Sequence, residues 1–403
     1  MLSRRQFLQT SSLVSLSPFV PSMLGNAAHA ASAAPDAKVL VVIQLDGGND
    51  GINTVVPYGD DAYGRVRKKL RLQTGKLHKL NDHVGLHPNM GAAKELFDDG
   101  RLTIVQGVGY PNPDRSHFRS MKIWQTARFD EDQHDGYGWL GRALDQRSLQ
   151  QSVSTTANAI YVGDDETPVA LWGRRSAAMS LSRADDLKLQ IELAPLTSSH
   201  SLQSSPSALH QFVSRQVLSA YAAADEFHRQ QVRKPKDGGA SFPNTKLGSR
   251  LKLISQLLQS GSQARVFYTM QSGYDTHSAQ LYTHARLLRG FSTALRAFLN
   301  DLRTAKLDDR VIVLGFSEFG RRVKENDSQG TDHGTAGPVF VAGQPVKGGL
   351  IGGASDLSDL DGGDLKMQLD FRQVYAPILD KWLRVPSADI LGSPFDALPI
   401  FEA

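Results

Sequence analysis

Apolar positions along the chain form two patterns that alternate with each other. Short apolar runs rich in β-branched residues, with little polar alternation, predict strands buried on both faces, as in a parallel sheet. These runs are 38–45, 102–106, 264–270, 310–316 and 338–342, with shorter strand candidates at 159–162 and 168–172. The segments between them predict helices at 89–99, 116–127, 209–233, 246–259, 279–304 and 370–384. The alternation predicts an α/β fold, a sandwich with a mainly parallel sheet.

One stretch interrupts this alternation. Residues 176–208 are rich in serine and contain Pro195 and Pro206, which predicts an irregular surface segment. With the residues that follow, it forms an expected insertion around 176–245. The rest of 31–403 is expected to be a single domain.

The first 30 residues differ in character from the rest of the chain. Arg4 and Arg5 precede a mildly apolar stretch at 10–24, and residues 28–30 read Ala-His-Ala, a small-x-small cleavage site. This order is typical of a twin-arginine signal peptide, which makes the twin-arginine translocation machinery an expected partner and the location periplasmic or secreted. A disordered basic tail is the alternative. The apolar stretch contains proline and is shorter than the ~20 residues of a spanning helix, so no stable transmembrane anchor is expected.

Charge and cysteine content narrow the chemistry. The formal net charge is +4, and it falls to +2 once residues 1–30 and their two arginines are removed. A nearly neutral chain gives no reason to expect nucleic acid or an anionic membrane surface as a partner. The sequence contains no cysteine, which excludes disulfides, thiolate metal sites and cysteine nucleophiles. Any metal must therefore bind through oxygen and imidazole ligands.

Residues of these types follow the predicted strands, at the ends where an open α/β sheet binds its ligands. In chain order they are Asp46, Asn49 and Asp50 after 38–45, Asp275 and His277 after 264–270, Glu318 after 310–316, and Asp332 and His333 before 338–342. Carboxylates and imidazoles are the groups that hold Zn²⁺ or Mn²⁺ without thiolates. Each residue alone is also typical of a turn or a helix N-cap. Their common position at one sheet edge favours a metal site.

A second candidate feature is the segment 110–120, which follows the strand at 102–106. It places Ser116 at the start of a predicted helix, where free backbone N–H groups favour negative charge. A serine that touches a divalent cation becomes a nucleophile, whereas the alternative is that Ser116 only caps the helix. Arg115 and Arg119 are candidates to bind the oxygens of a phosphate or sulfate, or else are solvated surface residues.

Seven short motifs occur together along the chain. They are Leu45-Asp46-Gly47-Gly48-Asn49-Asp50-Gly51, His87-Pro88-Asn89-Met90, Arg115-Ser116-His117-Phe118, Gly138-Trp139-Leu140-Gly141-Arg142, Tyr274-Asp275-Thr276-His277, Ser317-Glu318-Phe319-Gly320-Arg321-Arg322 and Thr331-Asp332-His333-Gly334-Thr335. The set resembles a bacterial family of unknown function whose members often carry twin-arginine signals and which is grouped as sulfatase-like within the alkaline phosphatase superfamily. The resemblance implies a three-layer α/β/α sandwich with one or two divalent cations, of Zn, Mn, Mg or Ca.

The resemblance also implies a role for each candidate site residue. Asp46 resembles an aspartate that binds one metal, and Ser116 stands where the superfamily places its nucleophile. Where the superfamily usually has Asp-His, this chain has Glu318-Phe319, so one imidazole is missing, and Asp332 or His117 is the candidate to replace it. The expected site comprises Ser116 and His117 as catalytic residues, Asn49, Arg115 and Arg119 as substrate-binding residues, and Asp46, Asp275, His277, Glu318, Asp332 and His333 as metal ligands.

Two functional hypotheses from different classes follow. The first is a metal-dependent hydrolase of phosphate or sulfate esters, which acts on a small anionic ester through a serine nucleophile. The second, suggested by Phe319, is a catalytically degenerate sulfatase-like protein that serves as a periplasmic binding or assembly factor.

Overall fold

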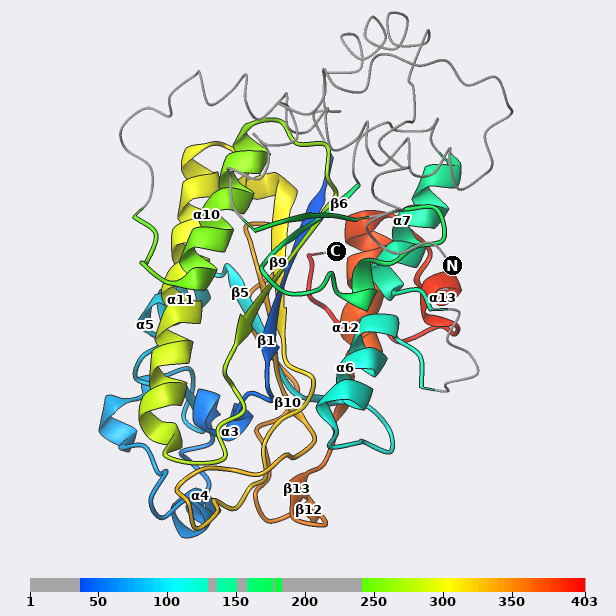
Figure 1. Cartoon of the computed structure of the whole chain (residues 1–403). Helices are drawn as coiled ribbons and strands as arrows, with labels where there is room; N and C mark the ends of the chain where they lie inside the picture. Colours follow the sequence, from blue (N-terminus) through cyan, green and yellow to red (C-terminus); the bar gives the residue numbers. More distant parts are fainter. Residues whose placement is uncertain (1–36, 130–135, 151–157, 177, 183–240, 403) are drawn as a thin grey trace, which may run out of the picture.

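The structure is a computed structural model that describes residues 37–129, 136–150, 158–176, 178–182 and 241–402 (Figure 1). The predicted signal peptide and the predicted helix at 209–233 lie outside the described residues, as does most of the predicted insertion. Among the helices of the described residues, none is long and apolar enough to cross a membrane.

A nine-stranded mixed sheet runs through the middle of the molecule. Its strands are β1 (Val39–Asp46), β5 (Leu102–Gly109), β6 (Ala159–Val162), β7 (Ala178–Leu181), β8 (Val266–Ser272), β9 (Val311–Phe316), β10 (Gly337–Ala342), β11 (Gly349–Ile351) and β14 (Leu369–Asp370). The order is β11-β5-β10-β9-β1-β8-β6-β7, and β14 pairs with β5. Only β10 runs antiparallel to its neighbours, β5 and β9, in this sheet. The predicted mainly parallel sheet is confirmed.

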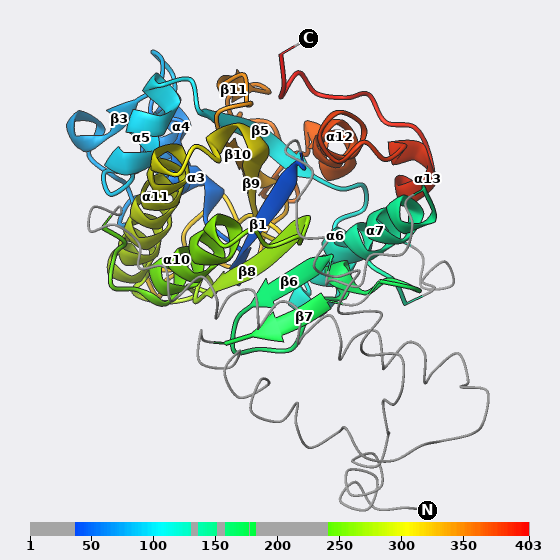
Figure 2. The same ribbon diagram turned by 90° about the horizontal axis from the view of Figure 1, so that it is seen from above.

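Helices cover both faces of the sheet, which confirms the predicted α/β/α layering (Figures 1 and 2). One layer contains α5 (Gly91–Asp98), α10 (Lys246–Gln259) and α11 (Gln280–Thr304). The other contains α6 (His117–Thr126), α7 (Trp139–Gln150), α12 (Phe371–Pro377) and α13 (Ser387–Leu391).

The central strand β1 shows why its sequence is apolar at nearly every position. Val41 and Ile43 pack in the core that includes residues of α10 and α11, whereas Leu40 and Val42 pack in the core that includes residues of α6 and α12. Successive side chains of a strand point to opposite faces, and both faces here are covered by helices. A strand in this position must therefore be apolar on both sides.

The structure differs from the predicted elements at three places. The predicted strand at 168–172 is wrong, because Val169–Leu171 forms a 3₁₀ turn (η3) that follows Pro168, whose fixed φ favours such a start. Residues 178–181, predicted to be irregular, form the edge strand β7. The predicted helix at 370–384 divides after Pro377 into α12 and a π-helical turn, η6 (Ile378–Leu383), because proline has no N–H for the α-helical ladder.

Short elements gather at the carboxyl end of the parallel strands, at the bottom of Figure 1. They are α3 (Gly51–Thr54), β2 (Val55–Val56), α4 (Asp61–Val66), η1 (Thr74–Lys76), β3 (His78–Lys79), β4 (Gly85–Leu86) and a hairpin of β12 (Leu360–Asp361) and β13 (Asp364–Leu365). A further 3₁₀ turn, η5 (Asp308–Arg310), leads into β9. The loops after β1, β8 and β9 therefore leave the sheet on the side where these small elements lie.

Candidate functional site

Loops from distant parts of the chain meet at this edge because glycines let them approach closely. Gly47 and Gly48 have φ angles of 116° and 74°, which favour glycine. A Cβ on Gly47 would lie 2.5 Å from the backbone nitrogen of Asp275, and one on Gly48 would lie 2.3 Å from the ring of Phe319. The loop after β1 therefore lies against the loops after β8 and β9.

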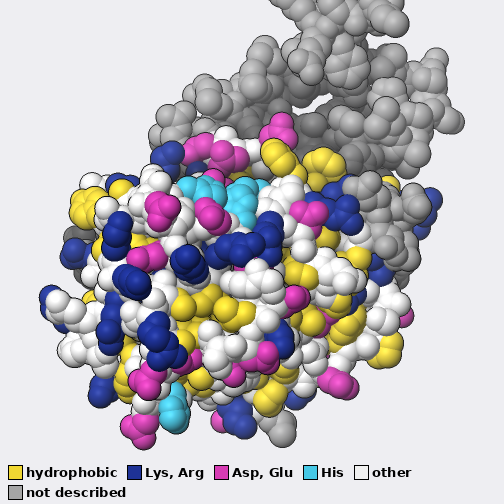
Figure 3. All heavy atoms as spheres, turned by 90° about the horizontal axis from the view of Figure 1, so that it is seen from below, with side chains coloured by type: hydrophobic (Ala, Val, Ile, Leu, Met, Phe, Trp, Pro, Cys, Tyr) yellow, Lys and Arg dark blue, Asp and Glu magenta, His cyan; other side chains and the backbone are white. Residues whose placement is uncertain are grey.

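The remaining parts of the site are placed by strand-like pairing and by aromatic packing. Arg321 and His333 form an isolated antiparallel bridge, which brings the loop before β10 beside the loop after β9. His117 is the first residue of α6, and α6 is held against the sheet by Trp124, whose ring stacks on Phe316 at 5.0 Å between centroids. Figure 3 shows the resulting cluster of histidine side chains on one open face of the molecule.

Four ligand atoms converge in this cluster. The Nε2 atom of His333 lies 3.1 Å from His117 Nε2, 2.9 Å from His277 Nε2 and 3.2 Å from Asp275 Oδ1. Asp275 Oδ1 also lies 3.0 Å from His277 Nε2 and 3.5 Å from His117 Nε2. Ligands about 2.0–2.1 Å from a tetrahedral Zn²⁺ are separated by roughly 3.3 Å, so the spacing of His117, Asp275 and His333 matches three positions of such a site.

The other ring nitrogen of each histidine faces an oxygen that can only accept a hydrogen bond. The contacts join His117 Nδ1 to Glu318 Oε1 at 2.7 Å, His333 Nδ1 to the Arg115 carbonyl at 2.8 Å, and His277 Nδ1 to Asp332 Oδ1 at 3.3 Å. When a ring is neutral, this contact favours the tautomer with the hydrogen on Nδ1, which leaves a lone pair on Nε2. Three lone pairs and a carboxylate oxygen that face one another repel unless a cation lies between them. The donor set fits a divalent metal ion, with the Nδ1 partners as its orienting shell.

Electrostatics at the cluster favour a charged Asp275. Partial burial raises the pKa of Asp275, but the hydrogen bond from Arg321 and the contact with the His333 ring outweigh it and lower the pKa to about 2. The hydrogen bond to Glu318 raises the pKa of His117. A carboxylate that is ionised across the whole physiological range is the form needed in a metal ligand.

The two other predicted carboxylate ligands lie deeper than the cluster. Glu318 is buried, and its oxygens accept hydrogen bonds from the Gly47 N–H at 3.0 Å and the Ser317 hydroxyl at 2.9 Å, besides the contact with His117. Burial and the charge of Glu318 raise the pKa of Asp46, whose Oδ1 accepts a hydrogen bond from the Gln44 side chain. The group of ligand side chains whose atoms all lie within 4.8 Å of one another, among the described residues, contains His117, Asp275 and His333. It includes neither of these carboxylates nor His277, which is close to His333 and Asp275 only.

Ser116 and the two neighbouring arginines lie at the start of α6. Ser116 is exposed at the start of α6, and its side chain makes no capping hydrogen bond. The Asp114 carboxylate accepts from the Ser116 N–H at 2.7 Å instead, so the helix start does not depend on the serine hydroxyl. Arg115 forms an ion pair with Asp364, and Arg119 lies 3.4 Å from Asp114.

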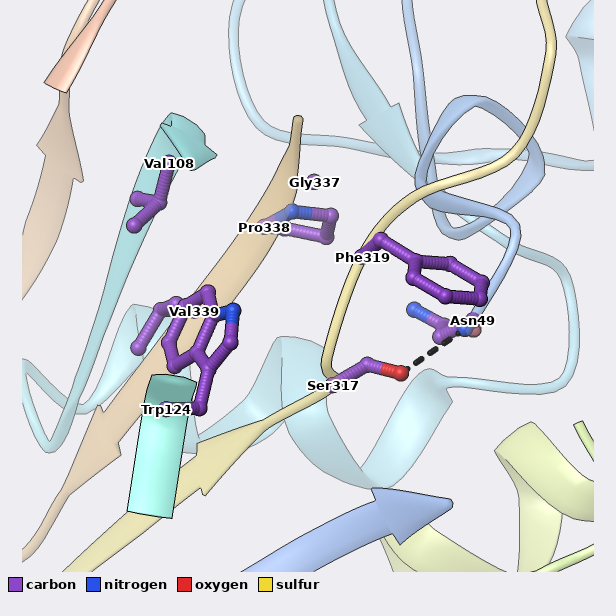
Figure 4. Close-up of a pocket in the computed structure, with 8 residues that line it drawn as sticks. All are labelled: Asn49, Val108, Trp124, Ser317, Phe319, Gly337, Pro338 and Val339. Atoms are coloured by element: carbon purple, nitrogen blue, oxygen red, sulfur yellow. Dashed lines mark hydrogen bonds between the residues drawn. The ribbon is translucent and has the colours of Figure 1, made fainter. Parts of the chain in front are cut away.

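Asn49 lies beneath the cluster instead of on its surface. It is 1% exposed, and its Oδ1 accepts hydrogen bonds from His284 Nε2 at 2.9 Å and from the Thr54 hydroxyl at 3.0 Å. Its backbone N–H donates to the Ser317 hydroxyl, the contact dashed in Figure 4. The Asn49 amide nitrogen points toward a small cavity that is also lined by Phe319 and Trp124 (Figure 4). The Asn49 side chain is thus shielded from solvent.

Sequence reasoning missed the buried residues that hold the site loops in place. Asp50 and Arg67 form a fully buried ion pair at 2.6 Å, and Gln280 donates a hydrogen bond to the same carboxylate at 2.5 Å. Arg321, also buried, donates to the Gly48 carbonyl at 2.6 Å and to Asp275 Oδ1 at 2.7 Å. Asp50 stood out in the sequence as part of a turn, but a lone Arg67 or Gln280 gives no signal, since these residue types are usually exposed.

We expect acidification to destabilise the fold through two buried histidines. Burial lowers the pKa of His284 to about 4 and that of His87 to about 3. The unfolded chain therefore binds protons below about pH 6.5 that the folded chain does not, and the free energy of unfolding falls by up to about 1.4 kcal/mol per pH unit for each ring. Urea unfolding at about pH 7 and about pH 5 measures this slope. His284→Gln, which keeps a donor for Asn49, should flatten it, and an unchanged slope would contradict the assignment.

Comparisons with known proteins give distant structural likenesses. No curated protein sequence matches the chain. Among solved structures, it is similar to the PsFucS1 sulfatase from Pseudoalteromonas sp. at 11% identity, with 94% of this chain and 72% of that chain covered and a TM-score of 0.38. It is similar to a TAB5 alkaline phosphatase mutant with magnesium bound, at 12% identity, 76% and 91% coverage and a TM-score of 0.33. It is also similar to the zinc complex of the C-terminal periplasmic domain of EcEptC from Escherichia coli, at 9% identity. That comparison covers 78% of this chain and 75% of that chain, with a TM-score of 0.36. Likenesses this distant carry no argument about activity.

The family comparison covers most of the chain. A family model matches residues 37–387, a range that includes every residue of the metal-ligand cluster. The predicted membership of a family of unknown function is thereby confirmed. The chain belongs to the family described as "Protein of unknown function (DUF1501)".

Proposed function

We propose that the protein is a metal-dependent hydrolase of phosphate or sulfate esters. The observation that carries the proposal is the convergence of three histidine Nε2 atoms and one carboxylate oxygen with no hydrogen available between them. Without a cation, the lone pairs of these atoms repel one another, which destabilises the arrangement. With a cation, the same set of atoms is typical of a zinc-type site. The motif resemblance to sulfatase-like proteins of the alkaline phosphatase superfamily supports the choice of ester.

The ligands proposed for the metal are His117, His277, His333 and Asp275. Glu318 and Asp332 act one step further out, where each accepts the Nδ1 hydrogen of one histidine and fixes its ring. A divalent cation held there would act as a Lewis acid on the nonbridging oxygens of the ester. His117 supplies the imidazole that the sequence lacks at Phe319, and the Phe319 ring packs against His117 with centroids 4.9 Å apart. The presence of this imidazole favours an enzyme over a degenerate binding factor.

Ser116 is the proposed nucleophile. It directly precedes His117 in the chain, and its hydroxyl is not used to cap α6. Attack of the serine oxygen on phosphorus or sulfur would form a serine ester as the bond to the leaving oxygen breaks, and water would then release the anion. Arg119 is a candidate to bind the anion from the same helix, whereas Asn49 is left out of the proposal because it is buried. The proposed location is periplasmic or secreted, after export through the twin-arginine machinery.

Elemental analysis and a substrate screen test this proposal. We expect the purified mature protein to contain about one divalent transition metal per chain and to hydrolyse aryl phosphates, phosphodiesters or sulfates. Ser116→Ala should lower the rate by at least about 1,000-fold while leaving the metal content unchanged. A metal-free protein, or a Ser116→Ala variant with substantial activity, would refute the metal or the nucleophile respectively.

A further inference from the structure

The β12–β13 hairpin lies apart from the main sheet, yet it is fastened to the segments that carry the metal-ligand cluster. Asp364 Oδ2 accepts a hydrogen bond from Arg115 Nε at 2.9 Å and another from Arg115 Nη2. The Gly362 carbonyl accepts from Arg322 Nη1 at 3.1 Å, and the Leu365 carbonyl accepts from the Thr335 hydroxyl at 2.6 Å. The hairpin therefore fixes two guanidinium groups beside the site.

The turn of the hairpin is shaped to receive one of these groups. Gly363 has a φ of 90°, and a Cβ there would lie 2.9 Å from Arg322 Nη1. A residue with a side chain would be strained and would displace the guanidinium. Glycine at this position keeps Arg322 against the hairpin.

One buried carboxylate pairs with both arginines, and both guanidinium groups stay partly exposed to solvent. The side chain of Asp364 is 1% exposed, whereas those of Arg115 and Arg322 are 43% and 33% exposed. Arg322 Nε is 3.9 Å from the second oxygen of Asp364, an oxygen with no hydrogen-bond partner in the described part of the chain. Both partly exposed guanidinium groups therefore share one buried anion, and the charge of Arg322 also acts on the Asp332 carboxylate.

The segments that carry Arg115 and Arg322 lie next to the metal-ligand cluster. The Arg115 carbonyl accepts the Nδ1 hydrogen of His333, and Arg322 follows Arg321, which bonds the ligand Asp275. Figure 3 shows a band of Lys and Arg side chains directly beside the histidine cluster. A molecule bound at the cluster would reach these guanidinium groups with its neighbouring part.

We propose that Arg115 and Arg322, positioned by Asp364, bind a second anionic group of the substrate, separate from the ester that is cleaved. The inference rests on the proposed ester hydrolysis and narrows its substrate class to esters that carry a further sulfate, phosphate or carboxylate. Guanidinium forks match the oxygen pairs of such groups, and side chains already held in place lose little entropy on binding. Arg322 is thus a specificity residue.

Binding of sulfonates, which cannot be hydrolysed at this centre, tests the inference without turnover. Calorimetry at low salt on the metal-loaded full mature protein would compare benzene-1,3-disulfonate with benzenesulfonate. We expect the disulfonate to bind about fivefold more tightly than the monosulfonate. This ratio corresponds to the free energy that one partly exposed ion pair contributes. Arg322→Gln should remove the difference. The matched control is Arg296→Gln, which replaces a partly exposed arginine of α11 that pairs with Glu95 of α5, and it should keep the preference.

A kinetic comparison separates the failure of this inference from the failure of the hydrolase proposal. Arg322→Gln should lower kcat/KM about fivefold for an aryl ester that carries an extra carboxylate, and leave the plain aryl ester unchanged. Equal binding of the two sulfonates by the unmodified protein, or a preference that survives in Arg322→Gln, overturns the subsite. Loss of the sulfonate preference in that variant, with no ester hydrolysed by the unmodified protein, supports the subsite and refutes the hydrolase.

Discussion

Replacing His333 with alanine is expected to abolish tight metal binding and ester hydrolysis together. His333 Nε2 lies 2.9–3.2 Å from the ligand atoms of His117, His277 and Asp275, so this side chain contacts all three other donors. Loss of a residue that only hydrogen-bonds to a metal ligand lowers metal affinity about 10–100-fold. Loss of a ligand itself should therefore lower metal affinity by more than about 100-fold. Competition with a chelator of known affinity measures the change, alongside the hydrolysis rate.

Thermal unfolding gives this prediction a second readout that does not depend on a substrate. Metal at about 100 times its dissociation constant stabilises the unmodified protein by about 2.7 kcal/mol, and should leave His333→Ala nearly unchanged. Glu318→Gln should fall between them, because only the partner of His117 Nδ1 is altered. His83→Ala, at an exposed histidine outside the cluster, is the control. A His333→Ala variant that keeps tight binding would contradict the four-ligand site.

The fold could be predicted from the sequence wherever burial dictates composition. The run at 38–45 is apolar on both faces because helices cover both sides of β1, and the helix predicted at 246–259 coincides with α10. The direction of a strand could not be predicted in the same way, because a parallel and an antiparallel buried strand have the same apolar pattern. The sequence of β10 therefore does not show that it runs antiparallel to β5 and β9. The predicted strand at 168–172 was wrong because a buried 3₁₀ turn and a short strand have similar apolar content.

The residue types of the site could be predicted from the sequence. Which of these residues face the metal centre, and which only orient the ligands, could not be predicted. The positions of Asp275, His277 and His333 after or before strands were enough to expect that they meet. Whether Glu318 or His117 faces the centre depends on backbone hydrogen bonds, such as that from Gly47 to Glu318, which no spacing in the sequence reveals. The expected role of Asp46 as a metal ligand stays a prediction.

Replacing Arg321 with methionine is expected to destabilise the fold more than any change at the open face. Its guanidinium is buried and donates to the carbonyls of Gly47, Gly48, Tyr274 and Thr331 and to the carboxylate of Asp275. This side chain of the loop after β9 thus joins three further site loops, those after β1, after β8 and before β10. Removing it leaves a carboxylate and several carbonyls without their donor, so urea unfolding should show a loss of about 3–5 kcal/mol.

Arg321→Lys distinguishes the role of the charge from the role of the planar fork. A lysine ammonium keeps the positive charge near Asp275 but cannot reach carbonyls on three loops at once. We expect it to recover part of the stability while metal affinity stays reduced by about tenfold, because Asp275 loses the partner that fixes its oxygen. Arg296→Gln, at an exposed ion pair on α11, should change unfolding by less than about 1 kcal/mol. If Arg321→Met proved as mild as Arg296→Gln, the site loops would have to be held by the Asp50–Arg67 pair instead.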